Sequence, residues 1–371
     1  MGASKRGRRR AAWLSGFAAA LLAATAGVTL AQGVAAALGT AAGPPVRFKL
    51  PPFPPRPFQL ISLDPAFDDL IAPGTELTTV ATLPPVGISE GVMWRQGKVW
   101  VCDQRGGIYA VAPDGSWGMV VEKDAWPIAP DRLENAGPGG QAAWKDGATL
   151  MTRQGPRDIG LRDRDGRITA FASAYDGKKL NSPNDLTVAR DDAVWFTDPP
   201  FGVEGFFRPN GRPVDKPLDF NGVFRVKDGK VSAMITDMVR PNGIVFSPDG
   251  KTLYVSGSAP AEVRAYDVGR DGALGKARVF ASFPADTPFG RGQPDGMKVD
   301  AKGDLWLIGA GGLLVYNPAG KLLGRVQLPM MGTNITFGDA DYRSVYISTY
   351  GDKLYRLRTK VKGQLPKYTQ L

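Results

Sequence analysis

From about residue 85 onward, the chain alternates short apolar runs with turns rich in Gly and Asp. The stretch NGIVFSPDGKTLYV, which starts at Asn242, shows the unit clearly: an apolar run, the pair Asp249-Gly250, and a second apolar run. This pattern predicts two antiparallel strands joined by a tight hairpin turn. Beyond the N-terminus no apolar run sustains the 3.6-residue period of a helix, so the pattern predicts an all-β chain.

This two-strand unit recurs six times, at intervals of 38 to 58 residues. The units are EGVMWRQGKVWV from Glu90, GQAAWKDGATLM from Gly140, NDLTVARDDAVWF from Asn184, NGIVFSPDGKTLYV from Asn242, DGMKVDAKGDLWL from Asp295 and TNITFGDADYRSVYI from Thr333. The intervals match the length of a four-stranded propeller blade, whereas the alternative, a β-helix, has shorter and more regular repeats. We therefore predict a six-bladed β-propeller over residues 63–371.

The N-terminus has a different pattern, in which SKRGRRR precedes the apolar run from Ala11 to Ala31. A basic segment before an apolar one predicts a signal peptide over residues 1–31, with Thr29 and Ala31 at the two key positions of a cleavage site. A retained membrane anchor is the alternative, because 21 residues can span a bilayer. Both readings predict export, with the rest of the chain periplasmic or extracellular. The proline-rich residues 32–62 predict an extended linker.

The composition excludes several kinds of partner and catalytic site. The net charge is +10, but five basic residues and no acid lie in residues 1–31, so the remainder carries only +5. That mild charge, without a basic stripe, argues against a nucleic-acid partner. The chain has no histidine, which excludes a Ser-His-Asp triad and any histidine metal site. Its one cysteine, Cys102, excludes an intramolecular disulfide and lies in a predicted buried strand.

The repeat register brings together residues that are far apart in the sequence. The inner strands of a propeller line a central channel, so equivalent positions lie at one height around the axis. Just before the predicted inner strands stand Glu90, Asn184, Asn242 and Asp295. Each Asn or Asp alone is more typical of a turn, whereas glutamate is not a turn former. As a set they predict a divalent metal site made of oxygen donors, most compatible with Ca²⁺, with Zn²⁺ or Mn²⁺ as alternatives.

Several longer motifs resemble one enzyme family. SEGVMW, NSPNDLTV, WFTDPPFG, RPNGIVFSPDGKTLYVS, PDGMKVD and TNITFG are similar to segments of the gluconolactonase, senescence marker protein and luciferin-regenerating enzyme family. The resemblance covers roughly residues 63–358. It implies a six-bladed propeller with one divalent metal, usually calcium, at the mouth of the channel.

The resemblance also implies residue roles. The family's metal ligands fall on Glu90, Asn242 and Asp295, while Asn184 matches an asparagine that binds metal or substrate. Asp295 matches the residue assigned as general base. This is the set that the repeat register selects.

The second repeat departs from the family pattern. Bacterial members often have Ala-Asn-Gly where this chain has Gly139-Gly140-Gln141, and Glu-His-Gly where it has Arg153-Gln154-Gly155. We expect Arg153 and Gln154 to replace the missing groups as substrate contacts.

Together these features predict a hydrolase of carboxylic ester bonds that opens a small-molecule lactone, with the metal polarising the carbonyl and Asp295 as general base. One alternative is a metal-dependent esterase or organophosphatase. A second is a non-catalytic binding propeller whose metal is structural. In each case the only predicted membrane association is through an uncleaved N-terminal segment.

Overall fold

The computed structural model describes residues 56–84, 88–122, 137–204, 215–283 and 293–369. The predicted signal or anchor segment and most of the predicted linker therefore lie outside the described residues. Within these ranges helix occurs only as two 3-10 turns, η1 (Pro65–Phe67) and η2 (Lys145–Gly147). No helix in the described ranges is both long enough and apolar enough to cross a membrane.

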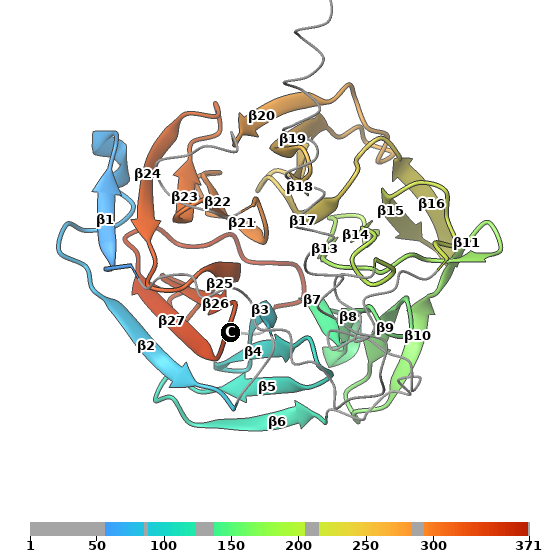
Figure 1. The fold of residues 1–371 in the computed structure, drawn as a ribbon, viewed down its shortest axis with the longest axis horizontal. Coiled ribbons are helices and arrows are strands. Elements are labelled where there is room, and N and C mark those ends of the chain that lie inside the picture. The colour runs from blue at the N-terminus through green and yellow to red at the C-terminus, as the bar shows by residue number, and fades with distance from the viewer. Residues whose placement is uncertain (1–55, 85–87, 123–136, 205–214, 284–292, 370–371) are drawn as a thin grey trace, which may run out of the picture.

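Six antiparallel sheets surround a central axis, which confirms the predicted six-bladed propeller (Figure 1). We number the blades in chain order, and the first strand listed for each blade is its innermost. Blades one and two are β3 (Ser89–Arg95), β4 (Lys98–Asp103), β5 (Ile108–Val111), β6 (Trp117–Val121), then β7 (Pro138–Ala143), β8 (Thr149–Arg153), β9 (Asp158–Arg162), β10 (Ile168–Ala172). Blades three and four are β13 (Leu186–Val188), β14 (Val194–Asp198), β15 (Gly222–Lys227), β16 (Lys230–Ile235), then β17 (Pro241–Phe246), β18 (Thr252–Ser258), β19 (Ala261–Asp267), β20 (Arg278–Ser282).

Blades five and six combine segments from both ends of the described chain. Blade five is β21 (Met297–Val299), β22 (Leu305–Gly309), β23 (Gly312–Tyr316), β24 (Leu322–Gln327) and β1 (Gln59–Ser62). Blade six is β25 (Gly332–Gly338), β26 (Ser344–Thr349), β27 (Lys353–Arg358) and β2 (Leu77–Thr82). A short hairpin, β11 (Ala174–Tyr175) and β12 (Lys178–Lys179), lies outside the blades.

The N-terminal strands close the ring. β2 is the outer strand of blade six and pairs with β27 from Leu77 opposite Leu357 to Thr82 opposite Lys353. β1 adds a fifth strand to blade five by pairing with β24, and it begins two residues after Pro57. This strand precedes residue 63, the position at which the sequence pattern placed the start of the propeller. The inner strands contact one another in succession around the whole ring.

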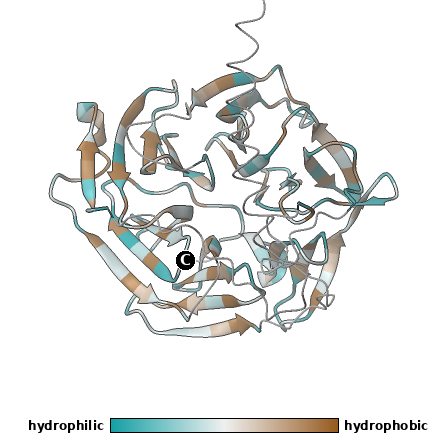
Figure 2. Cartoon of the chain, in the orientation of Figure 1, coloured by the Kyte–Doolittle hydropathy of each residue, from teal (hydrophilic) through white to brown (hydrophobic). Residues whose placement is uncertain are grey.

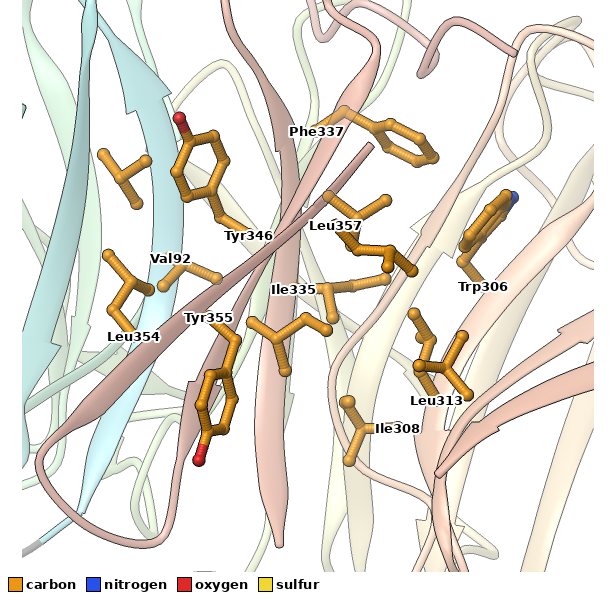
Figure 3. Close-up of a cluster of buried hydrophobic side chains, with 14 of the residues drawn as sticks. Val92, Trp306, Ile308, Leu313, Ile335, Phe337, Tyr346, Leu354, Tyr355 and Leu357 are labelled. Atoms are coloured by element: carbon orange, nitrogen blue, oxygen red, sulfur yellow. The ribbon is translucent and has the colours of Figure 1, made fainter. Parts of the chain in front are cut away.

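The core consists of layers between adjacent blades, and its position follows from the alternation of side chains along each strand. All seven residues of β3 are buried, because an inner strand has a neighbouring blade on both faces. Between blades five and six, the rings of Trp306 and Phe337 meet edge to face at 5.4 Å (Figure 3). Outer strands such as β2, in which one of six residues is buried, instead mix hydrophobic and hydrophilic residues, because one face meets solvent (Figure 2).

The predicted turns also form. Gln96 and Gly97 both have positive φ, 51° and 73°, as a two-residue hairpin joining β3 and β4 requires. At the matching place in blade four, the amide of Gly250 donates to the carbonyl of Ser247 at 2.8 Å. These turns lie where the inner strands end, so the opposite end of the channel is formed by residues at the starts of the inner strands.

Candidate metal and catalytic site

The four predicted ligands stand at the starts of four inner strands. Glu90 and Asn242 are the second residues of β3 and β17, while Asn184 and Asp295 lie two residues before β13 and β21. Their exposed fractions are only 6% to 9%. Because adjacent inner strands are in contact around the axis, all four residues belong to the same end of the channel.

Glu90 and Asp295 are close enough to influence each other's ionisation. Burial raises the pKa of Asp295 well above its ordinary value, and the negative charges of Glu90 and Asp185 raise it further. Burial likewise raises the pKa of Glu90 to about 7, although hydrogen bonds from Gly91 and Asn334 partly oppose this. Desolvation and like charge both disfavour the ionised carboxylates. A bound cation would offset both effects.

Two amide side chains organise these carboxylates. The Nδ2 group of Asn334 donates to Glu90 Oε2 at 3.3 Å. The Nδ2 group of Asn242 donates to Ser258 Oγ at 3.2 Å, and the same side chain hydrogen-bonds to Asp295. Since Asn242 donates through its nitrogen, its Oδ1 atom is the one suited to bind a cation.

Buried hydroxyl groups hold the backbone of the candidate residues in place. Thr152 of blade two donates to the carbonyl of Asn184 at 2.7 Å. The same contact joins the next two pairs of blades. Thr197 of blade three donates to the carbonyl of Asn242 in blade four at 2.7 Å, and Ser256 of blade four donates to that of Asp295 in blade five at 3.0 Å. We call these three residues the hydroxyl ring.

A similar contact occurs at the junction of blades six and one. There Thr333 Oγ1 contacts Ser348 Oγ at 2.7 Å and donates to the carbonyl of Ser89 at 2.5 Å. Ser89 directly precedes Glu90, so this contact fixes the strand that carries the fourth candidate residue. Sequence reasoning missed these hydroxyls, although Thr or Ser recurs near the end of the second strand in four of the six repeats.

Two further polar residues enter the channel beside the predicted set. Asp185 Oδ1 accepts from the amide of Leu186 at 2.8 Å, and Asn334 contacts Glu90 as described. A Cβ on Gly140 would overlap Asp185, and one on Gly296 would overlap Asn334. The glycine of the second repeat therefore leaves space for a carboxylate supplied by the next blade.

Arg153 and Gln154 are both buried at the end of β8. Arg153 forms a two-pronged ion pair with Asp158, with Nε to Oδ1 at 2.7 Å and Nη2 to Oδ2 at 2.6 Å. The backbone N–H of Gln154 donates to the carbonyl of Gly137 at 3.5 Å. This ion pair orients the guanidinium group, and a role for either residue in contacting substrate stays a prediction.

The donor set suits a hard divalent cation. Among the described residues, no three Cys, His, Asp or Glu side chains form a metal cluster. The candidate site instead combines two carboxylates, Glu90 and Asp295, with the amide oxygens of Asn184 and Asn242. Carboxylate and amide oxygens are the ligands that Ca²⁺ takes in proteins.

Comparisons with known proteins identify the family of this propeller. Residues 88–351 match the family model described as the SMP-30/Gluconolactonase/LRE-like region. A gluconolactonase from Zymomonas mobilis is 29% identical over 298 residues, which are 74% of this chain and 81% of that protein. A pentonolactonase from Haloferax volcanii is 32% identical over 176 residues, 40% of this chain and 59% of that protein.

Among solved structures, a gluconolactonase from Xanthomonas campestris superimposes with a TM-score of 0.71 and 33% sequence identity. That match covers 85% of this chain and 99% of the other. Because the family model spans most of the propeller, the chain belongs to the SMP-30/Gluconolactonase/LRE-like family.

Proposed function

We propose that this protein is a metal-dependent lactonase in which Asp295 acts as the general base. The observation that carries the proposal is the pair of buried carboxylates, Glu90 and Asp295, at the end of the channel where the inner strands begin. The similarity to the gluconolactonases of Xanthomonas campestris and Zymomonas mobilis supports a lactone as the substrate class.

The chemistry assigned to Asp295 is proton transfer. Its carboxylate removes a proton from water as the water oxygen bonds to the lactone carbonyl carbon. When the tetrahedral intermediate collapses, the ring C–O bond breaks and the ring oxygen takes up the proton, which yields a hydroxy acid. Burial raises the pKa of Asp295 above that of a solvated aspartate, so its carboxylate, once ionised, accepts a proton more readily.

Glu90, Asn242 and Asp295 would hold the cation. When bound, a divalent cation supplies positive charge that keeps the carboxylates ionised and stabilises the oxyanion formed on attack. Asn184 would hold the substrate, because its amide can both donate to and accept from sugar-like hydroxyls. The hydroxyl ring keeps the backbone of Asn184, Asn242 and Asp295 fixed while the reaction proceeds.

The test is a panel of lactones and esters assayed with purified protein, first in EDTA and then with calcium, zinc or manganese restored. We expect metal-restored lactone hydrolysis that falls at least about 100-fold in Asp295→Asn. The matched control is Asp271→Asn, which changes an exposed turn carboxylate and should leave the rate unchanged.

Each alternative has its own outcome. Turnover of simple esters or phosphotriesters without lactones would assign an esterase or organophosphatase. A cation that stabilises the fold without turnover of any substrate would assign a binding propeller. Full lactone turnover by Asp295→Asn would remove that residue from the mechanism.

A further inference from the structure

A cavity of about 730 Å³ lies at the other end of the channel. Its walls include residues from all six inner strands, beyond the positions of the candidate metal site. Residues 364–367 and 369 also line it, and we call residues 364–369 the C-terminal strap. None of Glu90, Asn184, Asn242 or Asp295 lines it. We call this space the far chamber, and its volume is typical of small-molecule sites.

The C-terminal strap is anchored across this end of the propeller. Tyr368 Oη donates to Asp192 Oδ1 at 2.5 Å, and its ring packs edge to face on Trp144 at 5.6 Å. Lys367 Nζ pairs with Asp192 and donates to the carbonyl of Arg190 at 2.8 Å. These contacts tie the strap to blades two and three, so one wall of the far chamber is fixed.

The far chamber carries an excess of positive charge. The charged residues that line it are Arg190, Arg225, Lys251, Arg270, Lys298 and Lys367, against Asp191 and Asp249. Arg225 pairs with Asp191 at 2.7 Å and Lys251 with Asp249 at 4.0 Å, while Lys367 pairs with Asp192, which is not a lining residue. A cavity with such an excess of positive charge favours an anionic ligand.

Lys298, in the inner strand of blade five, is one of the basic residues that line the far chamber. Its Nζ donates to the carbonyl of Met297 at 3.1 Å, and among the described residues it has no acidic partner at ion-pair distance. Its positive charge nevertheless acts on both Asp185 and Glu90, where it opposes the rise in pKa that burial causes. The ammonium group is therefore available to a ligand carboxylate.

Gln141, in the inner strand of blade two, provides a matching acceptor. The residue is 8% exposed, and its Nε2 donates to the carbonyl of Gly91 at 2.6 Å. Its Oε1 atom is buried and has no hydrogen-bond partner, and the side chain lines the far chamber. A buried acceptor without a partner costs free energy that a ligand hydroxyl would recover.

We propose that the far chamber binds a small hydroxylated organic acid, with its carboxylate at Lys298 and a hydroxyl donating to Gln141 Oε1. The charge excess selects the anion, and the unpartnered amide oxygen selects the hydroxyl. Binding here does not require that the opposite end of the channel hydrolyse lactones.

The test is calorimetric titration of the full-length protein with D-gluconate, alongside sorbitol and inorganic phosphate. We expect Lys298→Met to weaken gluconate binding at least about tenfold and Gln141→Leu about three- to tenfold, whereas Lys298→Arg keeps the charge and most of the affinity. Asp114→Asn, which changes an exposed turn carboxylate outside both sites, is the matched control and should bind gluconate as the wild type does. If Lys298→Met does not fold, Lys298→Gln takes its place.

Three results would overturn the proposal. Gluconate affinity that is unchanged in the folded Lys298 variants would remove the cation from the site. Affinity lost in Glu90→Gln but kept in Lys298→Met would place the ligand at the metal end. Sorbitol or phosphate that binds as tightly as gluconate would refute recognition of a hydroxylated acid.

Discussion

The hydroxyl of Thr197 should control how firmly Asn242 is held, and replacing Thr197 with Val tests this. Thr197 is fully buried, and its Oγ1 joins two blades: it donates to the carbonyl of Asn242 at 2.7 Å and accepts from the amide of Asp185 at 3.1 Å. Valine keeps the branched shape of the side chain but removes both hydrogen bonds. The substitution therefore isolates the hydroxyl from the packing.

The expected loss follows from these two contacts. Each buried hydrogen bond contributes about 1 kcal/mol net, and a backbone group left without a partner costs about 1–3 kcal/mol. Because valine gains some apolar burial, we expect Thr197→Val to lower the free energy of unfolding by about 2–3 kcal/mol. Thr197→Ser retains the hydroxyl and loses one methyl group, which should cost only about 1 kcal/mol.

The assay combines urea unfolding with the rate of lactone hydrolysis for both variants. We expect kcat to fall at least about tenfold in Thr197→Val, because a shift of Asn242 displaces a proposed ligand. Thr197→Ser should stay within about threefold of the wild type. If valine is as stable and as active as serine, the hydroxyl does not position the site.

Three further predictions concern other parts of the channel. In Gly140→Ala the added methyl group would overlap Asp185, so we expect the free energy of unfolding to fall by about 1–3 kcal/mol. Gly118→Ala is the control, because its methyl group would enter open space. Equal effects of the two variants in urea unfolding would contradict this prediction. Burial raises the pKa of Asp198 to about 7 from 3.8, so between these pH values the folded state binds a proton that the unfolded chain has released, and the free energy of unfolding falls as pH rises. Asp198→Asn imitates the protonated carboxyl, so the decrease in its free energy of unfolding over this pH range should be smaller than in the wild type by about 4 kcal/mol. Curves of stability against pH that run parallel for the two proteins would refute the assignment. Calcium at 100 times its dissociation constant should stabilise the wild type by about 2.7 kcal/mol in thermal unfolding. The same calcium concentration should stabilise Glu90→Gln less, and an equal stabilisation would show that Glu90 is not a ligand.

The sequence predicts the propeller well because each repeat carries its own local signals. The apolar runs define the strands, and pairs such as Asp249-Gly250 define the turns, so the six units can be aligned without knowledge of their neighbours. That alignment also selects Glu90, Asn184, Asn242 and Asp295, since equivalent positions in a symmetric ring share one height. The carboxylate pair that the structure brings together, Glu90 and Asp295, comes directly from this register.

The missed residues depend on contacts between blades. Gly140 looks like a lost amide in the sequence, but in the structure it leaves space for Asp185 of the next blade. Arg153 pairs with Asp158 on the adjacent strand of its own blade, and its contact with substrate stays a prediction. Lys298 and Gln141 belong to opposite blades, and neither residue has a local pattern that marks it as part of one cavity.

The way in which blade six is assembled has a consequence for biosynthesis. Leu77 in β2 pairs with Leu357 in β27, 280 positions later in the chain (Figure 1). Pairing over such a separation is slow, because the entropy of closing the loop is lost before the contact stabilises the chain. In the growing chain, β2 therefore stays unpaired until nearly the whole protein has been synthesised. During that time it can pair with incorrect strands. Synthesis of β27 thus completes the ring by pairing with β2. We expect the nascent chain to be most prone to aggregation just before this pairing.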